Sequence, residues 1–125
     1  IMTITFLLST ETENKSSSFE MIFIIGAIRF RFGFEVTKKN VTSEWLFGFD
    51  TENSNKESTY FTREHQNIKV SNRNFKEGKG LENNTRPNAL FLSTVAQPVT
   101  VKTTLAAAIA SNLFFIVNPL FTSVA

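Results

Sequence analysis

A glycine-lysine-glycine run at positions 78–80 is the part of this sequence that comes nearest to a known chemical motif. A Walker A loop has the pattern G-x-x-x-x-G-K-[ST]: backbone N–H groups surround the phosphates, the lysine reaches the terminal ones, and the hydroxyl binds Mg²⁺. Here Arg73 stands where the first glycine belongs, and Gly80 stands where the serine or threonine belongs. The run therefore predicts a glycine-rich turn before a helix and not a phosphate site.

The other side chains that could carry catalysis are isolated in the sequence. His65 is the single histidine, and one imidazole beside scattered carboxylates does not make a metal site. Ser93 has no base near it in sequence and no G-x-S-x-G pattern around it. The chain has no cysteine, which excludes disulfides and thiolate metal sites. We therefore expect no catalytic residues and no metal site, and an independent hydrolase is the function class with the least support.

Composition and charge favour one small globular domain. The chain has 125 residues, a net charge of +2 and no block of Lys or Arg, whereas a nucleic-acid surface needs clustered cations. In the run Arg29-Phe30-Arg31-Phe32, a period of two places the arginines on the opposite face from the phenylalanines. No nucleic-acid partner is indicated directly, and the absence of cysteine fits a cytoplasmic protein.

Strict alternation predicts a strand from Ile28 to Val36, with its apolar residues on one buried face. The preceding run FEMIFII, residues 19–25, is typical of a second strand, and Gly26-Ala27 can form the turn that joins the two. After a turn at 38–40, alternation resumes at 41–49 and places Val41, Ser43, Trp45, Phe47 and Phe49 on one face. This pattern predicts that Trp45 is an anchor of the core.

The later part of the chain predicts a loop, a hairpin and a helix. Residues 50–58 are polar, and two short strands at 60–63 and 68–70 flank a turn. A helix is expected over 88–97, with Thr85 as its N-terminal cap, Pro87 in its first turn and Pro98 after its end.

Both ends of the chain are apolar without being typical of membrane anchors. The run Ile4–Leu8 favours a strand, since no basic region precedes it as in a signal peptide. The run Leu105–Val117 is shorter than the roughly 20 residues of a spanning helix and predicts a buried or dangling helix instead. We therefore expect an α+β fold, with an antiparallel meander of about five strands and an exit helix in residues 1–97, followed by an apolar, helical tail in 98–125.

Several pieces of this chain, in the same order, resemble a family of bacterial and archaeal AAA-family ATPases that have an ABC/SMC-like head and are often linked to abortive infection or phage defence. The pieces are Phe19-Glu20-Met21, Phe32-Gly33-Phe34-Glu35-Val36, Glu44-Trp45-Leu46 and the run from Thr85 to Gln97. The resemblance covers about residues 18–97. It implies a β-subdomain with the helix that leaves it, inserted in a nucleotide-binding head.

The chain departs from this family where hydrolysis takes place. It has no Walker A motif, no ABC signature and no apolar run ending in Asp-Glu, because Phe114-Phe115-Ile116-Val117 is followed by Asn118-Pro119. ATP and Mg²⁺ are implied for an intact relative, and no cofactor is expected on this chain alone. The resemblance makes Gln97 a candidate ligand of Mg²⁺ and the attacking water, and Arg86 a candidate phosphate contact.

Two hypotheses follow for the function. The chain is either part of such an ATPase, an accessory β-subdomain whose partner is the rest of the head, or a small non-enzymatic module that binds a partner or a second copy of itself through its apolar tail. The change of composition after Gln97 is what a truncated or frameshifted gene would produce.

Overall fold

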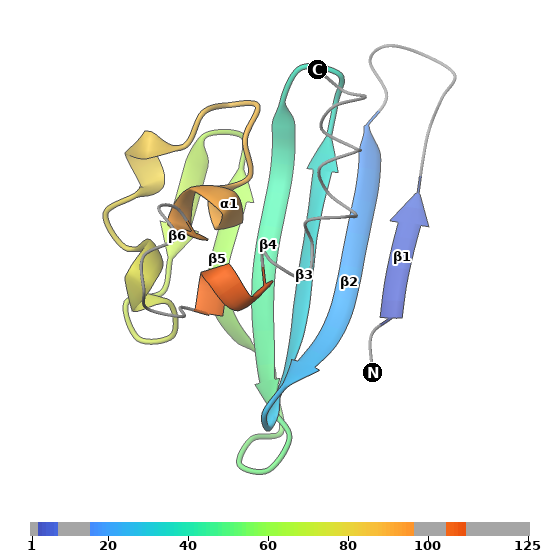
Figure 1. Cartoon of the computed structure of the whole chain (residues 1–125), viewed down its shortest axis with the longest axis vertical. Coiled ribbons are helices and arrows are strands. Elements are labelled where there is room, and N and C mark those ends of the chain that lie inside the picture. Colours follow the sequence, from blue (N-terminus) through green and yellow to red (C-terminus); the bar gives the residue numbers. More distant parts are fainter. Residues whose placement is uncertain (1–2, 8–15, 97–104, 110–125) are drawn as a thin grey trace.

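Six strands form one antiparallel sheet in the order of the sequence, β1-β2-β3-β4-β5-β6 (Figure 1). The computed structural model describes residues 3–7, 16–96 and 105–109. The strands are β1 (Thr3–Leu7), β2 (Ser17–Ile25), β3 (Ile28–Val36), β4 (Val41–Asp50), β5 (Ser58–Glu64) and β6 (Asn67–Val70). Two 3₁₀ turns, η1 (Lys76–Gly78) and η2 (Glu82–Asn84), and the helix α1 (Phe91–Ala96) follow. The predicted antiparallel meander and α+β class are confirmed.

The β2–β3 hairpin has the register that its alternating pattern predicts. Ile25 pairs with Ile28 across a two-residue turn, and Gly26 in that turn has φ +62°. Tight two-residue hairpins need a positive φ, which glycine adopts without the steric cost that a β-carbon brings. Phe19 pairs with Phe34 and Phe23 with Phe30 in the same hairpin, and each pair of rings is stacked.

The helical segments lie on one side of the sheet, which we call the core face (Figure 1). On this side an aromatic cluster connects the strand β5 to the segments after the sheet. The ring centroid of Phe61 lies 5.6 Å from that of Phe75 and 4.9 Å from that of Phe91. All three side chains are almost completely buried, so the segment after β6 completes the core and is not an appendage.

A β-bulge reverses the expected orientation of β4. Glu35 of β3 faces Ser43, but its neighbour Val36 faces Val41, so that Thr42 is an extra residue in the ladder. One extra residue shifts a period of two to the opposite face. From Glu44 onwards the even-numbered residues of β4 therefore point to the core.

The prediction that Trp45 anchors the core was wrong for this reason. Trp45, Phe47 and Phe49 are half-buried on the opposite side of the sheet, which they share with Arg29 and Arg31 and which we call the outer face. The core positions on β4 are instead occupied by Val41, Glu44, Leu46 and Gly48.

The helix after the sheet begins later than expected. α1 starts at Phe91 and not at residue 88, and the hydroxyl of Thr85 donates to the carbonyl of Leu81 (3.4 Å) instead of capping a helix. The expected helix end at Gln97 lies outside the described residues. Of the run expected to be helical over 105–117, residues 105–109 are helical and the rest also lies outside them. Within the described part of the chain, no helix has the length and apolar character needed to cross a membrane.

Candidate functional site

A buried ion pair lies on the core face, near the β5–β6 turn. Glu44 of β4 and Arg63 of β5 are direct cross-strand partners, and both side chains are 0% exposed. Nη1 of Arg63 lies 3.1 Å from Oε1 of Glu44. Removing two charges from water is costly, so such a pair persists only when further hydrogen bonds satisfy both groups. The surroundings of the pair meet this condition.

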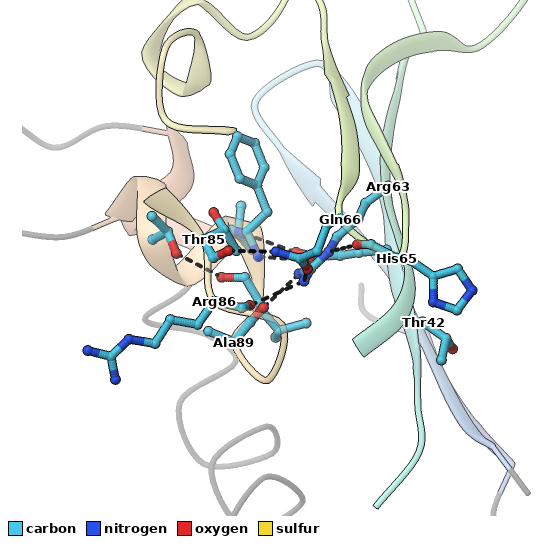
Figure 2. A network of polar contacts seen from close by, with 12 residues as sticks. Thr42, Arg63, His65, Gln66, Thr85, Arg86 and Ala89 are labelled. Carbon is cyan, nitrogen blue, oxygen red and sulfur yellow. Dashed lines mark hydrogen bonds and ion pairs between the residues drawn. The ribbon is translucent and has the colours of Figure 1, made fainter. Parts of the chain in front are cut away.

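The guanidinium of Arg63 uses its whole donor capacity on neighbouring acceptors (Figure 2). Its Nε donates to the carbonyl of His65 at 2.7 Å, and its two terminal nitrogens each donate to two further acceptors. Those acceptors are Oε1 of Glu44, the carbonyls of Ala89 (2.6 Å) and Arg86 (3.3 Å), and Oε1 of Gln66 (2.8 Å). Five N–H donors on a planar fork thus bind the β5–β6 turn and the segment before α1 at once.

Glu44 fastens the same segment from the other side. Its Oε1 accepts the backbone N–H of Phe91 at 2.7 Å, and its Oε2 accepts that of Leu92 at 3.0 Å. The first N–H groups of a helix have no partner within the helix and are normally satisfied by a nearby capping side chain. Here a carboxylate 47 residues earlier in the chain supplies the cap, and its negative charge faces the positive end of the helix.

Burial sets the protonation behaviour of Glu44. Loss of solvent raises the pKa of its carboxyl group to about 7, although the N–H donors of Leu92 and Phe91 and the charge of Arg63 all act in the opposite direction. Two surface carboxyl groups behave differently. Hydrogen bonds lower the pKa of Asp50 and of Glu57 below their usual values.

The raised pKa of Glu44 predicts that the protein loses stability as the pH rises from about 5 to 7. A carboxyl group with a pKa of 4.5 when unfolded and about 7 when folded binds more protons in the folded state, so the free energy of unfolding falls with pH across that window. The fall is up to about 3 kcal/mol. Asp50 and Glu57 have lowered pKa values, so the stability that they contribute is lost only below about pH 4 to 5.

Urea unfolding of the wild type and of Glu44→Gln at pH 5, 6 and 7 tests this expectation. The wild type should lose stability across the series, whereas the variant, which has no titrating group at this position, should stay nearly constant. Equal slopes in the two proteins would show that Glu44 does not titrate in this window.

The outer face is organised around Trp45. A β-carbon at Gly33 would lie 2.3 Å from Cζ2 of Trp45, so the indole ring lies directly on the glycine opposite it. The indole N–H donates to Oε2 of Glu20 at 2.8 Å. A glycine that weakens a strand is thus covered by an aromatic ring from the neighbouring strand, which restores contact at that position.

Two arginines of β3 lie over aromatic rings of β4 on the same face. The guanidinium carbon of Arg31 is 4.5 Å from the ring centre of Phe47, and that of Arg29 is 5.2 Å from the ring centre of Phe49. Arg31 also forms a two-pronged ion pair with Glu57 (2.9 and 3.0 Å). Its third bond reaches Glu20 at 3.0 Å, which connects it to the Trp45 site.

The glycine-rich run at 78–80 forms a turn. Gly78 is buried, and a β-carbon there would lie 2.8 Å from the ring of Phe75. Gly80 has φ +94°, and its N–H donates to the carboxylate of Glu82 at 2.8 Å. An N–H already bonded to a carboxylate does not face a phosphate, so the run turns the chain between η1 and η2.

Of the residues considered from the sequence, the structure describes Arg86 and His65 but not Gln97. Arg86 gives only its backbone carbonyl to the network, and its guanidinium points away from it (Figure 2). The His65 ring lies beside Thr42, on the other side of the strands from that network (Figure 2). Gln97 is outside the described residues. The described part of the chain contains no group of three or more metal-ligating side chains.

A shallow polar depression of about 410 Å³ lies beside the β-bulge. Glu35, Ser43, Thr62, Glu64 and Lys69 contribute to its wall, along with Thr42, Arg63, His65 and Asn67. No ion pair joins Glu35 or Glu64 to another described residue, so the depression presents two carboxylates to solvent.

The arrangement as a whole binds segments of the chain to one another.

Known protein families, curated proteins and solved structures were compared with the chain. None of them matches it. Sequence reasoning missed the Glu44–Arg63 pair. A usable signal was Glu44, a charge within the largely apolar strand β4, whereas Arg63 lies in a polar strand and gives no such signal. The hydrogen bonds of Glu44 and Arg63 join β4 and β5 to the segment around residues 86–92, so what they provide is positioning of that segment.

Proposed function

We propose that this chain is the accessory β-subdomain of an AAA-family ATPase with an ABC/SMC-like head, and that it does not hydrolyse ATP by itself. The observation that carries the proposal is a set of contacts. The four separate pieces of sequence on which the resemblance rests meet at two adjacent residues, Glu44 and Trp45.

On the outer face, Trp45 connects the first three pieces. Its ring covers Gly33, and its N–H binds Glu20, so the pieces around residues 20, 33 and 45 form one contact. The ring leaves room only for a glycine beneath it, and its N–H needs an acceptor, which Glu20 supplies.

On the core face, Glu44 connects the third piece to the fourth. Its carboxylate holds the N–H groups of Phe91 and Leu92, and its partner Arg63 holds the carbonyls of Arg86 and Ala89. The run from Thr85 to Ala96 therefore leaves the sheet in a direction that Glu44 determines. In an intact head, this network would orient Gln97 toward the nucleotide.

The absence of hydrolysis by this chain follows from the sequence. Phosphoryl transfer depends on a phosphate cradle and on carboxylate-held Mg²⁺ for positioning and charge stabilisation. The chain contains neither a Walker A loop nor a Walker B carboxylate pair. The partner that would complete such a site is the rest of the head.

Reading the genomic DNA on both sides of this coding segment tests the proposal. A Walker A motif encoded upstream and a Walker B motif encoded downstream are the expected result, and rejoining the frames should give a protein that hydrolyses ATP. Finding neither motif in any frame on either side would contradict the proposal and leave a self-contained module.

A further inference from the structure

We infer that the outer face of the sheet is the contact surface of a symmetric dimer, in which a second copy of this chain packs sheet to sheet. This inference goes beyond the proposed function and does not depend on the ATPase resemblance. It rests on the composition of the face and on the order of its charges along the strands.

The outer face has the composition of an interface. Trp45, Phe47 and Phe49 form a row of half-buried aromatic residues along β4, and Ile22 and Ile24 lie on the same face of β2. Ile24 is 48% exposed. Aromatic residues and arginine are enriched in interfaces, and apolar residues grouped on one face indicate a contact site.

Two charged residues of β3, Arg29 and Glu35, lie at equal distances from its centre, and the third, Arg31, is already paired with Glu20 and Glu57. Arg29 and Glu35 lie on the outer face, three residues before and three residues after Phe32, and are about 20 Å apart along the strand. Arg29 is exposed, and no ion pair joins it or Glu35 to another described residue. A surface with a cation at one end and an anion at the other, at equal distances from a centre, is complementary to its own reversed copy.

One two-fold axis satisfies this arrangement. The axis lies midway between two sheets stacked about 10 Å apart and runs perpendicular to the strands at the level of Phe32. It places each residue of β3 opposite the residue of the other copy's β3 that lies at the same distance on the other side of Phe32. Arg29 then faces the partner copy's Glu35, and on β4, Phe47 faces the partner copy's Trp45.

The same axis places the polar depression of one copy opposite Arg29 of the other. The cross-strand pair Glu35–Ser43 lines the depression, and the axis places it opposite the pair Arg29–Phe49 of the other copy. Arg29 is already stacked on Phe49, 5.2 Å from the ring centre, which holds its side chain in place before contact. Arg29 is thereby presented to a depression that is lined by two carboxylates, Glu35 and Glu64, and one ammonium group, Lys69.

Charge reversal on the full chain tests the inference. Sedimentation equilibrium should show a dimer for the wild type, and Arg29→Glu and Glu35→Arg should each raise the dissociation constant by about tenfold or more, because each places like charges together twice. An equimolar mixture of the two variants should regain the wild-type affinity, since both contacts then join opposite charges. Unchanged urea midpoints for the monomers would exclude misfolding.

Three results would overturn the inference. They are a wild type that stays monomeric at all concentrations, a dimer that survives both reversals, and a mixture that associates no better than its components. The second would place the contact elsewhere, for example on the apolar tail. A chain that is monomeric alone but binds single-stranded DNA through Trp45 would assign the face to a different occupant.

Discussion

Replacing Arg63 with methionine is expected to lower the free energy of unfolding by about 3–5 kcal/mol at pH 8. Methionine fills similar space but leaves the buried carboxylate of Glu44 without a counter-charge. It also leaves the carbonyls of His65, Arg86 and Ala89 without the donor that they have in the wild type. Since domains of this size have total stabilities of about 5–15 kcal/mol, the variant should be close to unfolding.

Arg86→Met is the matched control for this experiment. It changes the same residue type in the segment that Arg63 holds, but the Arg86 side chain is exposed and outside the network, so a change within about 0.5 kcal/mol is expected. Urea unfolding followed by circular dichroism measures both variants. If the two substitutions cost the same, the buried pair contributes no more than a surface residue. At pH 5 Glu44 is protonated and needs no counter-charge, so Arg63→Met should lower the free energy of unfolding by less than at pH 8.

Gly33→Ala is expected to destabilise the protein by about 1–3 kcal/mol, although alanine is usually the better residue in a strand. The new β-carbon would lie 2.3 Å from the indole of Trp45. The ring must therefore move away, and it would lose its hydrogen bond to Glu20.

Combining Gly33→Ala with Trp45→Leu separates this crowding from other effects. In the Trp45→Leu background, alanine at position 33 should be neutral or stabilising, because the ring that it would meet is gone. The fluorescence of the single tryptophan should also change in Gly33→Ala, as the indole leaves its site. The same cost in both backgrounds would mean that Trp45 does not cover Gly33.

Periodicity predicted the strands well where nothing interrupts the ladder. Residues 28–36 alternate without a break, and β3 occupies those residues, with its phenylalanines in the core. The same reasoning failed on β4 because one extra residue, Thr42, reverses the alternation. A bulge leaves no mark in a hydrophobic pattern, since Val41 and Leu46 satisfy the core on either side of it.

Because the orientation of β4 was predicted wrongly, the contacts on the outer face were not predicted either. The alternation within residues 28–36 places the arginines on the opposite face from the phenylalanines of the same strand. In the structure they lie against Phe47 and Phe49. The register between strands, and not the pattern within either one, decides which side chains meet.

The start of α1 could not be predicted because its cap is not local. Sequence rules look for a capping side chain within the first turn, and Thr85 satisfied them. Glu44, which binds the first N–H groups of the helix, is 47 residues before Phe91 in the sequence. Arg63, which binds the segment just before the helix, is 28 residues before Phe91. A tertiary contact therefore took precedence over the local signal.

Amide hydrogen exchange at Phe91 and Leu92 tests the central structural claim, that Glu44 ties the segment after the sheet to β4. The wild type should show protection at both amides close to that of the sheet, and Glu44→Ala should lose it at these two amides by a larger factor than elsewhere. Rapid exchange at both amides in the wild type, with a protected sheet, would contradict the claim. The run from Thr85 to Ala96 would then not be held by Glu44.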